Sequence, residues 1–336
     1  MLYDGRAAAR AARLSYATAP VSGASRRRVG RGFVYYDAKG RRITRPSELE
    51  RIARLAIPPA WKNVWISASP QSHLQATGTD AKGRKQYKYH PRFRAVREAA
   101  KYAHIRLFAE RLPGLRQRVR RELRRAGLDR DKVLSALVEL MQRTCMRVGN
   151  DCYAATNRSY GVTTLRDRHA TIRGSALRLQ FKGKAGKLHE ISLDDARLAR
   201  IVRRCRDLPG QRLFQYQDQD GQPHAVTSGD VNEYLRRVTG EPFSAKDFRT
   251  WSGTLLALHQ LDGSAAPGSE REARRAVRQA LEQVSAELGN TVSVCRKSYV
   301  HPLVIDQYTR GELAASLRRA RRAARRAPLR GLREIE

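Results

Sequence analysis

The sequence predicts an α+β protein, with a small N-terminal β-rich domain followed by a larger, mostly α-helical domain that contains a small β-hairpin. Two changes of pattern predict this class. Aromatic and β-branched residues around turn formers give way after Pro91 to helical spacing, and between residues 175 and 195 the period switches to two. The expected divisions are a flexible basic arm over 1–29, the β-rich domain over 30–92, the helical domain over 93–315 and a basic tail over 316–336.

Short strands separated by turn signals are expected in the β-rich domain. The segment GFVYYDAKGRRIT, which begins at Gly32, predicts two strands around an Asp-Ala-Lys-Gly turn. A further strand is expected over residues 61–66. A second turn over 80–83 is predicted to join a strand at 74–77 to one at 85–89.

In the helical domain, apolar residues recur at helical spacing from Val133 to Val148, and Gly149 predicts the helix stop, so that Arg147 would lie at the C-terminal end. Apolar and polar residues alternate over 177–182, and Gly-Lys-Ala-Gly turns the chain back, which predicts a hairpin with Lys184 at its tip. Further helices are expected around 229–238, 251–260 and 269–288, and from about residue 300.

The charge of the chain indicates its class of partner. Lys and Arg number 67 against 32 Asp and Glu, a formal net charge of +35. Such a surplus repels itself in a compact state and indicates a polyanion, above all nucleic acid. No stretch approaches the roughly 20 apolar residues that a bilayer span needs. The four cysteines form no C-x-x-C pair, which fits a reducing compartment and predicts a cytoplasmic protein.

Several common catalytic motifs are absent from the sequence. It contains no G-x-x-x-x-G-K-[ST] phosphate loop, no H-E-x-x-H and no dense carboxylate cluster. Chemistry on a phosphodiester would then depend on side chains: cations around the non-bridging oxygens, an acid for the leaving oxygen and an in-line nucleophile. Candidates lie in four segments: CMRVGND, QFKGKAGK, AKDFRTWSG and ELGNTVSVCRKSYVHP.

The order Arg, Lys, Arg, then Asn-x8-Tyr resembles the type IB DNA topoisomerases, specifically the compact bacterial enzymes similar to those of poxviruses. The resemblance extends from about Gly32 to Gly311 and is strongest in KDFRTWS, in LGNT followed by SY, and in TGTDAKGRKQYKYHP. It implies a two-lobed, C-shaped clamp that binds double-stranded DNA as a monomer. It also implies relaxation of supercoils without ATP, with a divalent cation at most stimulatory, by a nucleoid-associated protein.

The resemblance also implies catalytic roles. Tyr299 would attack the phosphodiester and form a 3′-phosphotyrosine, and Arg147 and Arg249 would hold the non-bridging oxygens with their planar forks. Lys184 would protonate the 5′ leaving oxygen. Asn290 stands where the poxvirus pattern has a histidine; its amide can still donate a hydrogen bond to phosphate but does not titrate.

DNA contacts are implied in both domains. The residues that align with family positions in the major groove are Lys82, Arg84, Lys85, Gln86, Tyr87 and Tyr89. Tyr153 and Lys246 match positions close to the cleaved strand. The alternative for the first group is a solvated edge strand protected by its charges.

Two other functions stay open at this stage. A tyrosine site-specific recombinase uses the same catalytic residues, although the β-rich N-terminal domain and the GRKQYKYHP block disfavour it. A non-enzymatic, nucleoid-packing basic protein would explain the charge but would leave the spaced motifs as coincidence.

Overall fold

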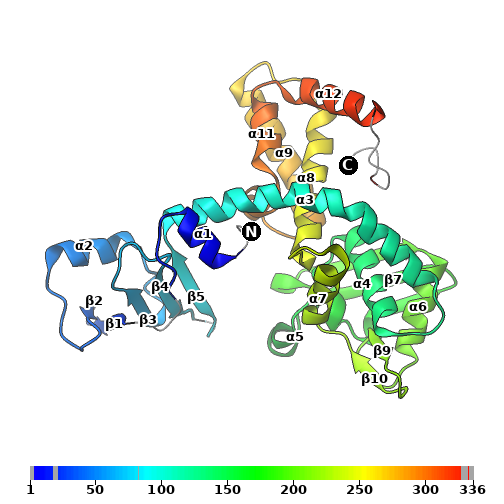
Figure 1. The fold of residues 1–336 in the computed structure, drawn as a ribbon, viewed down its shortest axis with the longest axis horizontal. Coiled ribbons are helices and arrows are strands. Elements are labelled where there is room, and N and C mark those ends of the chain that lie inside the picture. Colours follow the sequence, from blue (N-terminus) through cyan, green and yellow to red (C-terminus); the bar gives the residue numbers. More distant parts are fainter. Residues whose placement is uncertain (1–3, 18–21, 82, 327–331, 333–336) are drawn as a thin grey trace. The chain divides into compact units, whose positions relative to one another are not determined.

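The computed structural model describes residues 4–17, 22–81, 83–326 and 332. The chain divides into two compact units, Met1–His104 and Ile105–Glu336, whose elements Figure 1 labels. The first unit is built on a sheet and the second mostly on helices. This confirms the predicted α+β class.

The first unit contains a five-stranded antiparallel sheet in the order β2-β1-β3-β4-β5. The helix α2 (Pro46–Arg54) packs through Ile52 against Val64, Ile66 and Ala76. The predicted turn after residue 79 joins β4 to β5 as expected, whereas the second strand of GFVYYDAKGRRIT is reduced to a single bridge between Tyr36 and Arg42. The strands are β1 (Gly23–Val29), β2 (Gly32–Tyr36), β3 (Lys62–Ser67), β4 (Leu74–Thr79) and β5 (Lys85–Tyr89).

The flexible arm expected over residues 1–29 is wrong for the described part of that segment. Residues Gly5–Ala11 form α1, which Asp4 caps by accepting a hydrogen bond from the Arg6 amide. Small apolar side chains on and after α1 bury against Phe93, and β1 pairs with both β2 and β3. The many arginines of this segment made it look disordered in the sequence. Their charged ends can stay in solvent while the alanines between them form a small apolar face that packs.

The division between the units falls inside α3 (Pro91–Arg124), at 104/105, and not at the expected 92/93. Pro91 occupies the first position of the helix, where its missing N–H costs nothing. The change of pattern at Pro91 therefore marks the start of a helix and not a linker. Phe93, in the first turn, still belongs to the core of the first unit.

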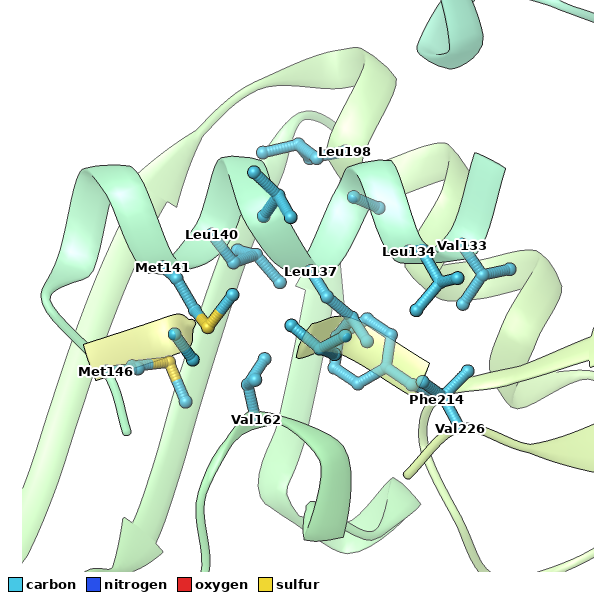
Figure 2. Packing of buried hydrophobic residues seen from close by; sticks show 14 of the residues in the cluster. Val133, Leu134, Leu137, Leu140, Met141, Met146, Val162, Leu198, Phe214 and Val226 are labelled. Carbon is cyan, nitrogen blue, oxygen red and sulfur yellow. The ribbon is translucent and has the colours of Figure 1, made fainter. Parts of the chain in front are cut away.

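The second unit is organised around α4 (Arg130–Thr144), which is buried on nearly every side. Figure 2 shows its apolar side chains gathered with Met146, Val162, Phe214 and Val226. The buried polar pair Ser135 and Tyr234 is satisfied internally, with 2.7 Å between their hydroxyl oxygens. The run Val133–Val138 of this helix is wholly buried, and the helix leads directly to the loop that carries Arg147.

A three-stranded antiparallel sheet in the order β6-β7-β8 lies in the same unit. The predicted hairpin is confirmed as β7 (Ala176–Lys182) and β8 (Leu188–Asp194), with Phe181 opposite His189 near the tip. The third strand, β6 (Ala170–Arg173), was not predicted. Alternate residues of β7, Leu177, Leu179 and Phe181, are buried, which is the period-two pattern seen in the sequence.

A second apolar cluster surrounds α9 (Glu270–Leu288), whose buried face carries Val277, Leu281, Val284 and Leu288. The expected helices are all present, and α10 (Val292–Ser298) is an additional short one. The remaining elements are α5 (Asp151–Asn157), α6 (Ala196–Arg206), β9 (Gln215–Gln217), β10 (Pro223–Ala225), α7 (Ser228–Thr239), α8 (Ala245–Asp262), α11 (Pro302–Thr309) and α12 (Leu313–Arg326). In the described part of the chain, no helix combines the length and apolar character needed to cross a bilayer.

Candidate active site

Arg147 lies in a loop directly after α4. The helix ends earlier than predicted, because Cys145 adopts a left-handed conformation (φ 54°) and caps it. Placing Arg147 on the helix, with Gly149 as the stop, was therefore wrong. The loop allows the Arg147 side chain to reach the C-terminal end of α9, where its Nη2 donates to the Gly289 carbonyl at 3.2 Å and to Asn290 Oδ1 at 2.6 Å.

The C-terminal end of α9 also binds the second arginine. Arg249 Nη2 donates to the Leu288 carbonyl at 2.7 Å, so consecutive residues 288–290 accept hydrogen bonds from both guanidinium groups. Gly289 ends the helix in the left-handed region, at φ 58°, which exposes these carbonyls. The last carbonyls of a helix carry partial negative charge and favour cations. We call Arg147 and Arg249 the guanidinium pair.

Arg249 is the more deeply placed of the two, with 4% of its surface exposed. It lies on α8, one turn after Ser244 and Asp247 cap the helix reciprocally. Its Nη1 donates to the Cys145 carbonyl at the end of α4. A buried charge is tolerated only when it is paired or hydrogen-bonded, and here backbone carbonyls from two helix ends provide those bonds.

Tyr299 lies beside Arg249, whose guanidinium carbon is 5.2 Å from the centre of the phenol ring. Tyr299 caps α10, and its backbone rests on α8: the Thr254 hydroxyl donates to the Tyr299 carbonyl at 3.4 Å. A Cβ at Gly253 would stand 2.7 Å from that carbonyl oxygen. Arg249 and Gly253 are one helical turn apart. The helix α8 therefore supplies both a cation and the surface on which the Tyr299 backbone packs.

Tyr308, the other tyrosine near the C-terminus, has a different environment. It is 4% exposed and its hydroxyl donates to the Ala265 carbonyl at 3.0 Å. It is a packing residue of the α9 cluster and a suitable control for Tyr299.

Two buried donors in the site have no acceptor among the described residues, Arg249 Nε and Asn290 Nδ2. An unsatisfied buried donor costs about 1–3 kcal/mol, and more when it is charged. Asn290 Oδ1 is already engaged by Arg147, which orients the amide so that Nδ2 is the free group. Donors of this kind fit the oxygens of a ligand such as phosphate.

The pKa of Arg147 reflects the crowding of positive charge. Burial, and next the charge of Arg249, lowers the pKa of Arg147 to about 10, while Tyr299 acts in the opposite direction. The pKa of Arg147 is lowered because the site holds two positive charges and too few negative groups to balance them. An anionic ligand would relieve that deficit.

Lys184 is exposed at the tip of the hairpin, in a 3-10 turn over Lys184–Gly186. It makes no hydrogen bond or ion pair with the described residues, so the structure does not bring it into contact with Tyr299 or the guanidinium pair. The hairpin reaches the site through Lys187, whose Nζ donates to the Asn290 carbonyl at 3.5 Å. Lys184 is thus on an element that borders the site.

Two further candidates flank this centre. Lys246 is exposed in the first turn of α8, three residues before Arg249, a spacing that puts both on neighbouring positions of the helix surface. Tyr153 lies on α5 and is 46% exposed. Both are accessible to a ligand.

The candidates of the first unit lie on and before the edge strand β5. Lys85, Tyr87 and Tyr89 alternate along it on its exposed face, and the two tyrosine rings stack at 6.0 Å and 8°. Gln86 points to the other face.

Arg84 and Gln86 share a partner: both bind Asp80, at 2.7 and 2.9 Å. The residues of the first unit that the sequence predicts to contact DNA therefore do not all lie on one face of β5. Lys82 lies outside the described residues.

Within the described ranges, no group of three or more His, Cys, Asp and Glu side chains could hold an ion.

Several functional features escaped the sequence analysis. They are backbone groups and small residues: the carbonyls of Cys145 and Leu288, the left-handed Gly289, and Gly253 with Thr254 as the seat of Tyr299. Two of them left a signal in the sequence. Gly253 is a glycine inside an otherwise helical segment, which often marks a close approach, and Gly289 directly follows the helix expected over 269–288, the usual place of a left-handed cap.

Comparisons with known proteins bear on both units. Residues 90–324 match the family model for the catalytic core of eukaryotic DNA topoisomerase I. Residues 32–80 match the model for the N-terminal domain of bacterial DNA topoisomerase IB. DNA topoisomerase 1B of Acanthamoeba polyphaga mimivirus is 32% identical over 295 residues, which cover 86% of this chain and 88% of that protein.

A solved structure of the XerH site-specific recombinase bound to palindromic difH substrate, a post-cleavage complex, is a more distant likeness. It has a TM-score of 0.36 and 15% identity, and the match covers 61% of this chain and 52% of the recombinase chain. This chain thus spans about half the length of that protein, and a likeness at this level does not bear on function.

Proposed function

The chain belongs to the type IB DNA topoisomerases, and from this premise we propose how its residues carry out the reaction. The chain is a DNA topoisomerase whose substrate is DNA. The observation that supports the residue roles is the arrangement in the second unit: Arg147, Arg249 and Asn290 meet at the end of α9, and Tyr299 lies against Arg249.

In the proposed cleavage step, the Tyr299 hydroxyl oxygen attacks a phosphorus atom of one DNA strand and its proton passes to solvent. The bond between phosphorus and the 5′ oxygen breaks, and that oxygen takes a proton from Lys184. The product is a 3′-phosphotyrosine and a free 5′-hydroxyl. Because one phosphodiester replaces another, the bond energy is conserved.

Resealing is the reverse reaction. A phenol is a better leaving group than the alkyl hydroxyl of deoxyribose, so the 5′-hydroxyl can displace Tyr299 and no ATP is needed. Strand swivelling between the two steps would be driven by the torsional strain of the DNA. That no nucleotide is required, and that a divalent cation is at most stimulatory, stay predictions.

The guanidinium pair is proposed to hold the non-bridging oxygens during the transfer. Each arginine commits part of its fork to backbone carbonyls and keeps other N–H groups for the ligand. Asn290 Nδ2 and Arg249 Nε, which lack acceptors among the described residues, supply two of these donors. Their fixed placement means that little reorganisation is needed when charge develops.

DNA contacts outside the centre are proposed for Lys246 and Tyr153 near the cleaved strand, and for the exposed face of β5. Lys85, Tyr87 and Tyr89 combine a cation with stacked rings, and the Lys85 ammonium lies 5.8 Å from the Tyr87 ring centre. Such a surface suits phosphates and base edges. Enclosure of DNA as a clamp, a monomeric state on DNA and a cytoplasmic, nucleoid-associated location stay predictions.

The test uses a supercoiled plasmid without any special site. Wild type should relax it and leave a covalent protein–DNA adduct when denatured during the reaction. Tyr299→Phe should lose both activities, and Tyr308→Phe, the matched control, should keep both. A dependence on paired sites would support a recombinase instead, and adduct formation by Tyr299→Phe would remove Tyr299 from the nucleophile role.

A further inference from the structure

One ring on the hairpin that carries Lys184, that of His189, packs against the turn after α9. This histidine lies on β8 directly opposite Phe181 of β7. The two rings stack with their centres 5.1 Å apart and their planes at 11°. His189 is therefore a fixed part of the hairpin surface just behind the tip, which we define as residues 183–187.

The other edges of the ring meet two glycines. A Cβ at Gly183, in the tip, would stand 2.5 Å from His189 Cδ2, and a Cβ at Gly289 would stand 3.1 Å from His189 Cε1. The imidazole thus fills the gap between the tip and the turn after α9. The cavity that remains there is about 20 Å³, the space of about one water molecule.

Gly289 is the residue between Leu288 and Asn290, which bind the guanidinium pair. The surface against which His189 rests is therefore the same turn that positions both arginines. The second link from the hairpin to this turn, Lys187 Nζ to the Asn290 carbonyl, is long at 3.5 Å and made by an exposed side chain. Since Lys184 itself has no hydrogen bond within the described chain, its position depends on how the hairpin is seated.

We propose that His189 is a positioning residue: it docks the hairpin tip on the turn after α9 and so sets where Lys184 meets the leaving 5′ oxygen. This inference rests on the proposed acid role of Lys184. It assigns no proton transfer to His189. The prediction is that losing His189 impairs the step that needs the acid, while the guanidinium pair and Tyr299 keep their function.

The charges around His189 make the docking sensitive to pH. The ring faces Arg147 from the loop after α4, Arg249 from α8 and Lys187 from its own hairpin; burial, and next these cations, lower its pKa. The other titratable groups that line the cavity are Glu287, Tyr160 and Cys145. A neutral ring fits among three cations, whereas a protonated ring adds a fourth, so docking should weaken as the pH falls through the lowered pKa.

The decisive experiment measures single-turnover cleavage by the full chain on two substrates, one normal and one with a bridging sulfur in place of the 5′ oxygen. A thiolate leaves without protonation, so it removes the need for Lys184. We expect His189→Ala to slow cleavage of the normal strand about ten- to a hundredfold, part of the roughly 10²–10⁴ that a general acid contributes. On the thiolate substrate its rate should lie within about threefold of wild type.

Lys184→Ala is measured in parallel, so that the acid role of Lys184 and the docking role of His189 can be rejected separately. If the thiolate does not rescue Lys184→Ala, the acid role of Lys184 is wrong. If it rescues Lys184→Ala but not His189→Ala, the docking role of His189 is wrong, as it also is if His189→Ala leaves the normal rate unchanged. Leu188→Ala, which removes a neighbouring side chain that is 70% exposed, should behave as wild type on both substrates.

Two more variants separate docking from general damage. Gly183→Ala places a methyl group against the His189 ring. As a single variant it should slow cleavage of the normal strand and be rescued by the thiolate substrate, as His189→Ala is. Combined with His189→Ala, it should slow cleavage no further. His189→Phe keeps a flat ring on Phe181 but does not titrate. It should retain most of the normal rate and lose the acidic limb that we expect in the pH profile of wild type. An additive Gly183→Ala defect, or an acidic limb that persists in His189→Phe, would overturn the proposal.

Discussion

The guanidinium carbon of Arg249 lies 5.2 Å from the centre of the Tyr299 ring. Arg249 cannot easily move away, because its Nη groups donate to the carbonyls of Cys145 and Leu288 at the ends of two helices. A cation held over a phenol is favourable in itself. The cation held against the ring of the proposed nucleophile therefore depends on the packing of α4, α8 and α9.

Arg249→Lys tests the geometry of the cation, not only its charge. A lysine keeps the charge but lacks the fork that reaches two carbonyls and still leaves Nε free. We expect cleavage to fall by about 10²–10³, with DNA affinity changed less than about tenfold, measured by single-turnover cleavage and by equilibrium binding. Equal losses in the two measurements would mean that Arg249 acts in binding and not in the transition state.

Asn290 provides a test of the free amide donor. Asn290→Ala removes both the acceptor for Arg147 and the Nδ2 donor, and should slow cleavage by about 10². Asn290→Asp keeps the acceptor but replaces the donor by an anionic oxygen that repels phosphate, so it should be at least as slow. Asn290→His keeps a donor and should stay within about tenfold of wild type. A fast Asn290→Asp variant would show that Nδ2 does not contact the phosphate.

Alkaline pH should inactivate the free enzyme through Arg147. Its pKa is lowered to about 10 by burial and by Arg249, so the guanidinium loses its charge, and its attraction for phosphate, as the pH rises through that value. Bound phosphate favours the charged form and should raise this pKa again. The alkaline limb should therefore appear in kcat/KM and lie at higher pH in single-turnover cleavage of bound DNA.

The limb is measured on the substrate with a bridging sulfur, whose cleavage does not need the Lys184 proton. On that substrate the control Arg147→Ala should be slow at every pH and show no loss near the same point. If the limb of kcat/KM is unchanged in that variant, another group is responsible for it.

Gly253→Ala should displace Tyr299 without replacing a catalytic residue, because its methyl group would meet the Tyr299 backbone and, at 3.2 Å, the Tyr299 Cβ. The added methyl group would stand 2.7 Å from the Tyr299 carbonyl oxygen, and because that atom is backbone, α10 must shift. We expect slower cleavage and a loss of about 1–3 kcal/mol in the free energy of unfolding. Gly114→Ala is the control, since nothing lies within 4 Å of its added methyl group. It should leave cleavage unchanged and, in a helix, stabilise by at most about 1 kcal/mol.

DNA affinity should depend steeply on salt. With a formal net charge of +35, the enzyme should neutralise several phosphates and release their counterions. About six contacts would lower the association constant by about 10³ between roughly 50 and 200 mM salt. The Lys85→Ala and Lys246→Ala variants should each reduce the slope of log K against log salt by about 1. A slope near zero in wild type would contradict an extensive phosphate interface.

The residues proposed for the centre came from the resemblance of short motifs to a family. The α+β class, the two-part organisation and the hairpin of β7 and β8 were predicted from the sequence alone. These depend on local periodicity, turn residues and short motifs, which are written in consecutive positions. The helix end at Cys145, the order in the basic N-terminal segment, the seat of Tyr299 on Gly253 and the docking of His189 between Gly183 and Gly289 were visible only in the folded chain. Each of these depends on backbone carbonyls or on the space between residues far apart in sequence, and a pattern of side-chain types carries no record of that space.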